Sequence, residues 1–340
     1  MRMDERKFLI LQAIIDDYIM TAVPVGSRTI SRKQGVGFSP ATIRNEMSDL
    51  EELGYLDQPH TSSGRVPSPK AYRLYVDHLL KVSEVGREDA ERISAYLHQR
   101  ATQVEQVIKR AAQVLSDITQ YTALVTAPEV EALRIVRVQL VPVSASKALV
   151  IVVTSAGLIK DAVIRVPEAL GSHHLYELSQ MLTNQLHGLS LSEVRRRFAE
   201  LFVGMKENRR LLAGVLEVIE NRLEDEAKGE VMVGGSANLL SHPEYADVEK
   251  AKHFLSVLES REKLYPLLKQ AGAMEFTIRI GPENDLPELS ECSLVTVGYH
   301  MGKQAGGTIG IIGPTRMDYG RVLSVLSYMG RMITEMLSEN

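Results

Sequence analysis

Residues 24–76 hold the most informative pattern of this chain, and they read PVGSRTISRKQGVGFSPATIRNEMSDLEELGYLDQPHTSSGRVPSPKAYRLYV. Ahead of them, apolar residues recur every three or four positions over 4–20, which predicts an amphipathic helix. Ser27 is suited to cap a short second helix over 28–34, and Gly35 offers a left-handed exit from that helix. The helices predicted over 4–20 and 28–34 therefore form a pair joined by a tight turn.

A third helix has the strongest start signal. Ser39 can cap its orphan N–H groups, Pro40 suits a first helical position that needs no N–H, and Gly54 marks its end. The polar residues near its N-terminal end are of the kind that a recognition helix presents to base edges in the major groove. The predicted base contacts are Ser39, Thr42, Arg44 and Asn45.

A short hairpin follows the third helix. Residues 55–57 predict a strand, residues 58–64 a turn, and residues 65–66 the returning strand. Small residues at the tip let backbone N–H groups approach a phosphate, and an arginine there adds a charged hydrogen bond or enters a minor groove. The predicted contacts of this wing are Ser63, Gly64 and Arg65. Helices followed by a wing form a winged helix-turn-helix, for which DNA binding is the leading interpretation and docking of a protein the alternative.

The placement of charge supports DNA binding better than the formal net charge of −4 does. Residues 24–44 contain four basic and no acidic side chains, and residues 58–76 contain three basic and no acidic ones. The acids between them fall on the back of the third helix or beyond its end. Such local positive potential steers a protein toward phosphates. The predicted phosphate contacts are Arg28, Arg32, Lys33, Arg65, Lys70 and Arg73.

Length and cysteine content limit the class of protein. A chain of 340 residues favours two or three domains, each able to bury a core. Its single cysteine, Cys292, excludes an internal disulfide and a multi-cysteine zinc site, as suits a reducing cytoplasm. The first 20 residues contain acids around a short amphipathic core, unlike a signal peptide, and the longest apolar run, 148–153, is far too short to span a membrane. We expect a cytoplasmic protein without a membrane partner.

The rest of the chain predicts an α+β, multidomain fold. Residues 87–120 have the pattern of one long helix that connects the winged helix to the body, and residues 133–166 that of a three-stranded meander. Residues 191–270 are mostly helical, after which strands resume over 274–312 and a helix closes the chain over 320–337. Strands on both sides of a helical segment indicate one sheet domain interrupted by an insertion.

The body offers no catalytic, cofactor or metal constellation. Gly307, Gly310 and Gly313 lie in a strand pattern and lack the G-x-G-x-x-G spacing of a dinucleotide site, so we interpret them as positions of close backbone packing. The three histidines within 173–187 lack an H-E-x-x-H motif and are interpreted as surface or capping residues. Cys292 has no C-x-x-C partner and is interpreted as a packed thiol. An enzyme is therefore not expected.

Seven stretches carry a family resemblance: VGSR at 25–28, SPATIRNEM at 39–47, GYL at 54–56, HTSSGRVPSPKAYRLYVD at 60–77, GSANLL at 235–240, CSLVT at 292–296 and GTIGIIGPTRMDYGRV at 307–322. Through them the chain resembles the heat-inducible transcription repressor family, HrcA, over nearly its whole length.

The resemblance implies a repressor that binds double-stranded DNA at an inverted-repeat operator upstream of chaperone operons and is kept active by the chaperonin GroEL. It also implies a winged helix, a GAF-like α/β domain and a dimerisation domain inserted within the latter. Combined with the pattern above, we expect the winged helix at 1–82, the first GAF-like part with its connecting helix at 87–190, a mostly helical dimerisation insert at 191–270, and the second GAF-like part at 271–340. A palindromic operator also favours a homodimer.

Two other functions stay open at this point. One is a regulator in which a metabolite binds the GAF-like domain and changes the affinity of the winged helix for DNA. The other is an enzyme with an appended DNA reader, which would require a convergent set of catalytic groups that the sequence does not offer.

Overall fold

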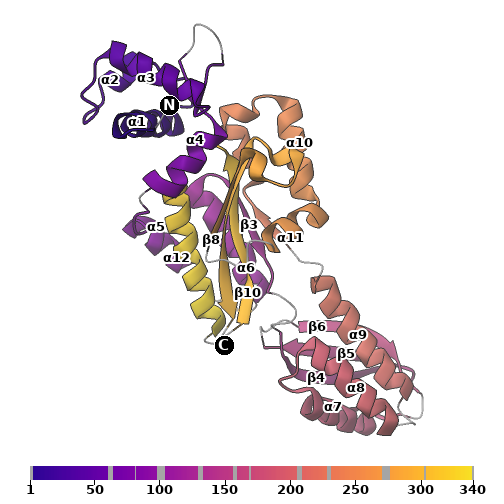
Figure 1. The fold of residues 1–340 in the computed structure, drawn as a ribbon. Helices are drawn as coiled ribbons and strands as arrows, with labels where there is room; N and C mark the ends of the chain where they lie inside the picture. Colours follow the sequence, from indigo (N-terminus) through magenta and orange to yellow (C-terminus); the bar gives the residue numbers. More distant parts are fainter. Residues whose placement is uncertain are drawn as a thin grey trace.

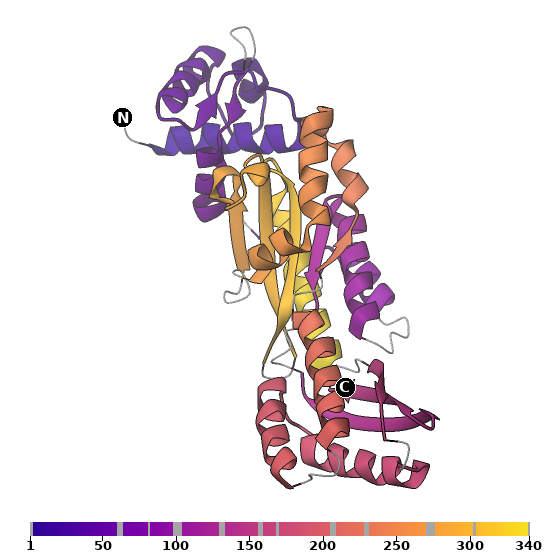
Figure 2. The same ribbon diagram turned by 90° about the vertical axis from the view of Figure 1, so that its right-hand side faces the viewer.

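The structure is a computed structural model that describes residues 3–59, 64–80, 82–97, 104–128, 133–155, 159–167, 170–204, 209–227, 231–269, 276–301 and 304–338. Three parts follow one another along its length (Figure 1). The head comprises the described residues up to 80, the central unit contains a five-stranded sheet, and the outer unit contains a three-stranded sheet. Figure 2 confirms that the central unit lies between the other two.

The head contains the predicted helices and hairpin. Its elements are α1 (Glu5–Thr21), α2 (Ser27–Ser31), α3 (Pro40–Glu52), β1 (Leu56–Asp57), β2 (Val66–Pro67), α4 (Pro69–Leu74) and the π-helix η1 (Tyr75–Leu79). Gly26, and not Ser27, occupies the N-cap of α2, while Gly35 has the predicted left-handed conformation with φ +89°. A backbone bridge between Val25 and Arg65 ties the start of α2 to the hairpin. The small core is closed by fully buried aliphatic side chains of the three helices, such as Ile14, Ile30 and Leu50.

The central unit is an antiparallel sheet with helices on both faces. Its strand order is β7 (Val231–Gly234), β3 (Thr122–Thr126), β10 (Gln304–Pro314), β9 (Cys292–Met301) and β8 (Phe276–Ile280). Helices α5 (Arg87–Leu97), α6 (Val104–Thr119) and α12 (Tyr319–Ser338) lie on one side, and α10 (Val248–Glu259) and α11 (Arg261–Lys269) on the other (Figure 1). Alternate strand residues supply the two cores: Ile311 belongs to the first and Ile312 to the second.

The outer unit contains the predicted meander. Strands β4 (Ile135–Ser144), β5 (Lys147–Thr154) and β6 (Ile159–Arg165) pair in sequence order, with α7 (Ser172–Leu186), α8 (Leu191–Gly204) and α9 (Arg209–Ala227) beside them. Helix α7 covers the free edge of β4, because Ser179 Oγ accepts a hydrogen bond from Leu140 N–H at 2.9 Å and Thr183 Oγ1 one from Val138 N–H at 3.1 Å. The exposed backbone of an edge strand is thereby satisfied.

The course of the chain through these units differs from the predicted boundaries. The five-stranded sheet is interrupted between β3 and β7, so that the meander and its helices are set apart, whereas 231–269 pack on the central sheet. The predicted insert at 191–270 therefore takes in elements of both units. An alternating pattern predicts a strand but not the strand with which it pairs. The sequence therefore suggests one sheet, whereas the meander forms a separate three-stranded sheet.

The predicted long helix over 87–120 is also different. Helices α5 and α6 pack against each other and against α12, so they are two helices folded together. Each buries its own stripe, with Ile93 and Leu97 from α5 and Ile108 and Leu115 from α6. Two successive apolar stripes in nearly the same phase are indistinguishable from one long stripe in sequence.

The interpretation of the glycines and of the lone cysteine is confirmed. A β-carbon on Gly307 would lie 2.7 Å from Thr126 Oγ1, and one on Gly313 would lie 2.7 Å from the Tyr121 ring, so both allow close packing. Cys292 is buried beside the Tyr245 hydroxyl at 3.1 Å, and burial raises the pKa of its thiol to about 11. Within the described residues there is neither a helix able to cross a membrane nor a group of three or more His, Cys, Asp or Glu side chains suited to a metal ion.

Candidate nucleic-acid interface

The start of α3 is fixed as predicted. Ser39 is its N-cap and Pro40 its first residue, and Ser39 Oγ accepts a hydrogen bond from Thr42 N–H at 3.1 Å. The two hydroxyls of Ser39 and Thr42 lie 2.9 Å apart. Because the Ser39 oxygen satisfies the first turn of the helix, this residue positions α3 and orients Thr42.

The two faces of α3 differ sharply. Ile43, Met47 and Leu50 are buried in the head, whereas Arg44 and Asn45 are exposed. Four of the predicted contact residues have exposed side chains with no hydrogen bond or ion pair to another described residue: Arg28, Arg32, Arg44 and Asn45. Since α2 and α3 pack together, we refer to these four exposed residues as the α2–α3 face.

Two acids of α3, Glu46 and Asp49, are bound by a lysine of α1. Lys7 of α1 is buried, and its Nζ lies 2.7 Å from Glu46 Oε2 and 3.0 Å from Asp49 Oδ2. These hydrogen bonds raise the pKa of Lys7 above its usual value despite the cost of desolvation. Sequence reasoning missed Lys7, although its position three and four residues before Ile10 and Leu11 on the buried stripe of α1 was a usable signal. The acids therefore do not oppose a polyanion on the α2–α3 face.

The wing residues lie differently from the prediction. Arg65 donates from Nε to Glu51 Oε2 at 2.8 Å, and its backbone pairs with Val25. A β-carbon on Gly64 would lie 2.5 Å from the Val25 carbonyl carbon, so this glycine allows the backbones to approach. Arg65 is thus engaged within the head, and its pairing with Glu51 was hidden because 14 residues separate the two. The predicted contact Ser63 lies outside the described residues.

The second basic segment is also engaged within the protein. Lys70 Nζ donates to the Leu53 carbonyl at 2.8 Å, which places a cation at the C-terminal end of α3, and it lies 4.4 Å from the centre of the Tyr55 ring. Arg73 donates from Nε to Glu283 Oε1 at 2.9 Å and from a terminal nitrogen to the Ile278 carbonyl at 2.6 Å, both in the central unit. Lys70 and Arg73, which were predicted to bind phosphates, therefore both have partners within the protein.

Lys33 departs from the prediction as well. Its Nζ lies 2.7 Å from Asp17 Oδ1, and both side chains are partly buried. The partner lies on α1, which precedes the basic segment in the sequence. Of the predicted cations in the head, the α2–α3 face retains Arg28, Arg32 and Arg44.

Fold and surface together define a class: a mixed helix and sheet protein of three parts, in which a helical head with a hairpin exposes three arginines on and beside its second and third helices. Comparison with known proteins then gives the family. A family model described as the HrcA protein C terminal domain matches residues 105–323.

Curated relatives match over nearly the full chain. The heat-inducible transcription repressor HrcA of Acetivibrio thermocellus is 43% identical over 340 residues, covering 98% of this chain and 96% of the relative. That of Pelotomaculum thermopropionicum is 41% identical over 339 residues, covering 99% and 97%. The chain belongs to the HrcA family of heat-inducible transcription repressors. Its relatives are named as repressors and not as enzymes, in agreement with the sequence analysis.

A solved structure supports the arrangement of the whole chain. The crystal structure of a hypothetical protein at 2.2 Å resolution superposes with a TM-score of 0.69, at 26% identity, and covers 99% of each chain. The overall fold of the chain is therefore similar to that of an experimentally solved protein.

Proposed function

We propose that this repressor binds, as a homodimer, an inverted-repeat operator in double-stranded DNA and places α3 of each head in successive major grooves. The observation that carries the proposal is the α2–α3 face, where three arginines and Asn45 are exposed while Glu46 and Asp49 are bound by Lys7. Repression of transcription requires an operator to be recognised, and a recognition helix is the element that can read one.

Within this face the residues have two roles. Arg44 and Asn45, in the second turn of α3, would contact base edges, because arginine pairs with guanine and asparagine with adenine through two hydrogen bonds each. Arg28 and Arg32, on or next to α2, would bind phosphates and fix the register of the head. Thr42 and Ser39 stand at the start of α3, where Ser39 acts through its cap.

The homodimer is proposed to form through the open face of the outer sheet. Ile159 and Val163 of β6 are 54% and 55% exposed, and across from them Val153 and Leu149 of β5 are only half-buried. Exposed apolar side chains on a sheet face, which here lie on either side of the exposed Asp161, favour a partner, and a second copy is the partner that a two-fold operator demands. In this proposal the outer unit serves as the dimerisation domain and the central unit as the GAF-like domain.

Chaperonin GroEL is retained as a proposed partner on the strength of the family resemblance alone. A physically sufficient account is mass action, in which free chaperonin raises the fraction of correctly folded repressor and heat-denatured proteins compete for it. Full recovery of operator binding at the same rate with and without chaperonin, after denaturation and dilution, would contradict it.

The operator proposal is tested by fluorescence anisotropy. The duplexes are an inverted repeat from a chaperone-operon promoter and a scrambled sequence of equal length, each at two salt concentrations. Preference for the repeat by a factor of about 1,000 or more is expected of a specific reader. Equal and steeply salt-dependent binding to both duplexes would reduce the α2–α3 face to a nonspecific basic surface.

The dimer is tested separately by sedimentation at micromolar concentration. Val163→Asp places a charge in the proposed interface and should shift the protein to monomer. Tyr176→Asp is the matched control, because Tyr176 is 61% exposed but lies on α7. Dimers that persist in Val163→Asp would place the interface elsewhere.

A further inference from the structure

The head is joined to the central unit by two arginines, one contributed from each side. We propose that Arg316 and Arg73 are positioning residues for operator binding, because they fix the orientation of α3 relative to the body and so set the spacing of half-sites that a dimer accepts. This inference rests on the proposed function, and neither residue touches the DNA-binding face.

Arg316 reaches from the body to the end of α1. It lies in the loop between β10 and α12, its side chain is 11% exposed, and one terminal nitrogen donates to the Ile19 carbonyl at 3.0 Å. Ile19 is in the last turn of α1, where carbonyls lack helical partners and where the helix has no basic residue of its own. The same guanidinium binds both carboxylate oxygens of Glu244, which holds it in one plane.

Arg73 crosses in the opposite direction. From α4 of the head it binds Glu283 through two nitrogens and donates to the Ile278 carbonyl at 2.6 Å. Ile278 lies on β8, the edge strand of the central sheet, whose outward carbonyl would otherwise be open. Two planar groups that approach from different elements resist rotation of the head better than one does.

Between the arginines lies a buried aromatic contact. Tyr72 of α4 is 1% exposed and lies 6.1 Å, centre to centre, from the ring of Tyr319 at the start of α12. The Tyr319 hydroxyl is itself held by Ser293 at 2.7 Å and by the Thr315 carbonyl at 2.6 Å. Buried polar groups add little to stability compared with apolar packing, but they penalise alternative geometries. The contact is thus suited to selecting one orientation.

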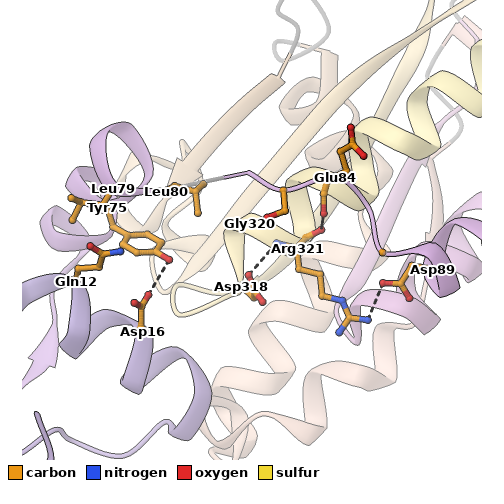
Figure 3. A pocket seen from close by; sticks show the side chains of 13 residues that line it. Gln12, Asp16, Tyr75, Leu79, Leu80, Glu84, Asp89, Asp318, Gly320 and Arg321 are labelled. Carbon is orange, nitrogen blue, oxygen red and sulfur yellow. Dashed lines mark hydrogen bonds and ion pairs between the residues drawn. The ribbon is translucent and has the colours of Figure 1, made fainter. Parts of the chain in front are cut away.

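The other side of the junction is a cavity of about 530 Å³ (Figure 3). Head and body both line it, but the polar contacts drawn among its lining residues stay within one part: Tyr75 donates to Asp16 at 3.1 Å in the head, and Arg321 binds Asp89 at 3.2 Å in the body. The polar bonds between the parts are therefore concentrated at Arg316 and Arg73. Without them, the cavity leaves room for the head to tilt.

A fixed head matters only when two heads bind together. Binding of the second head is an intramolecular step whose strength depends on how well the two α3 helices match the half-site spacing. A loosened head still binds one half-site normally. It loses affinity for the full repeat at its native spacing and tolerates altered spacings.

The experiment compares wild type with Arg316→Met on three duplexes: the native repeat, the repeat with half a helical turn inserted between half-sites, and a single half-site. We expect a loss of about tenfold or more on the native repeat, unchanged half-site binding, and reduced discrimination between the two spacings. Arg316→Lys keeps the charge without the planar fork and should fall between. The matched control, Arg87→Ala, removes an arginine that is 93% exposed, and should behave as wild type.

Exchanging the charges of Arg73 and Glu283 tests whether a loss of spacing discrimination comes from the broken ion pair or from misfolding. Arg73→Glu should loosen the junction, and Arg73→Glu with Glu283→Arg should restore part of the spacing discrimination, because both side chains are partly exposed. Equal losses of Arg316→Met on half-site and full repeat, or intact spacing discrimination in that variant, would overturn the inference.

A DNA-free measurement separates this inference from the proposed function. Spin labels on Gln34→Cys in the head and Glu335→Cys on α12, with unlabelled chain in excess, report the width of the head-to-body distance distribution. Arg316→Met should broaden it and Arg87→Ala should not, while an unchanged width would overturn the positioning role. If wild type fails to prefer the repeat but Arg316→Met broadens the distribution, the operator proposal fails and the role of Arg316 in orienting the head stands.

Discussion

The two basic segments of the head look alike in sequence and differ in the structure. In the first, Arg28, Arg32 and Arg44 extend to solvent without a partner among the described residues. In the second, Arg65, Lys70 and Arg73 each bind an oxygen of the protein itself: Arg65 binds an acid of the head, Lys70 a backbone carbonyl, and Arg73 both Asp77 of the head and Glu283 of the central unit. A run of basic residues in the sequence therefore does not show that their side chains are free to bind a phosphate.

The difference comes from where the partners lie in the sequence. Glu283 is 210 residues from Arg73, and the partner of Lys70 is a backbone carbonyl, which no charge pattern records. A cation with such a partner keeps its charge but loses its freedom to follow a phosphate. We therefore assign operator contacts to the first segment and structural roles to the second, and the variants below test that division.

The largest effect is expected from Lys7→Met, which removes the support behind the first segment. Asp49 would lose its charged partner, and Glu46, which is only 8% exposed, would keep only the half-exposed Arg6 at 3.4 Å. Removing one member of a buried ion pair costs about 3–5 kcal/mol, because the other charge stays desolvated. The loss in the free energy of unfolding is measured by urea titration, in which the unfolded fraction is read from proteolytic cleavage within the head.

Lys7→Met with Glu46→Gln is the control for that variant. It removes the orphaned charge with the cation, so much of the lost stability should return. If Lys7→Met were as stable as wild type, the acids of α3 would not be held by Lys7 in solution.

Arg44→Ala and Asn45→Ala should follow in size, and they test whether the first segment reads bases. Each bidentate contact discriminates by about 1–3 kcal/mol, so the ratio of affinities for operator and scrambled DNA should fall by about 5- to 150-fold. Both side chains are exposed, and stability should change little. Equal losses on the two duplexes would show that these side chains bind only the backbone of the DNA.

Arg28→Ala and Lys70→Ala compare the two segments directly. Arg28→Ala should lower the slope of log affinity against log salt by about one unit, as expected when one phosphate contact is lost. Lys70→Ala should leave the slope unchanged and lower stability by about 0.3–1 kcal/mol, because Lys70 binds the end of α3. A slope that changes with Lys70 and not with Arg28 would reverse the assignment of the two segments.

Helix caps and turn residues predicted the elements of the head well, because each of them depends only on residues that are adjacent in the sequence. The Ser39-Pro40 start and the left-handed Gly35 depend only on neighbours, and both are present. The ion pairs of Lys33 with Asp17, of Arg65 with Glu51 and of Arg73 with Glu283 depend on acids brought close by folding. Only the pair of Arg73 with Asp77 has a local spacing, of four residues. Four of the predicted contacts remain on one exposed face for the same reason: helical spacing is local.

The body was harder to predict, and the reason is topological. The three strands of residues 133–166 were recognised as a meander, but β7, at 231–234, pairs with β3 more than 100 residues earlier. Both sheets use β-branched residues in alternation, so the pattern gives strands without sheet membership. Separation of the outer unit from the central unit thus required the structure.

Asp16→Asn is expected to have the smallest effect, and it probes the junction that anchors the second segment. Partial desolvation raises the pKa of Asp16, although the residue remains exposed to solvent; Asp318 adds to the rise, while Tyr75 and Lys33 oppose it. A carboxyl with a raised pKa binds a proton more tightly in the folded state, so stability falls as pH rises from the unfolded value near 3.9 through the folded value. At pH 7 Asp16→Asn should therefore stabilise the protein, by about 0.5 kcal/mol at most for a group this exposed, and the gain should vanish below about pH 3.5.

The neighbouring Asp17→Asn breaks the 2.7 Å ion pair with Lys33 and should destabilise at pH 7 instead. Thermal melts of both variants at the two pH values decide the sign, and a destabilised Asp16→Asn at pH 7 would mean that the Asp16 carboxylate supports the junction.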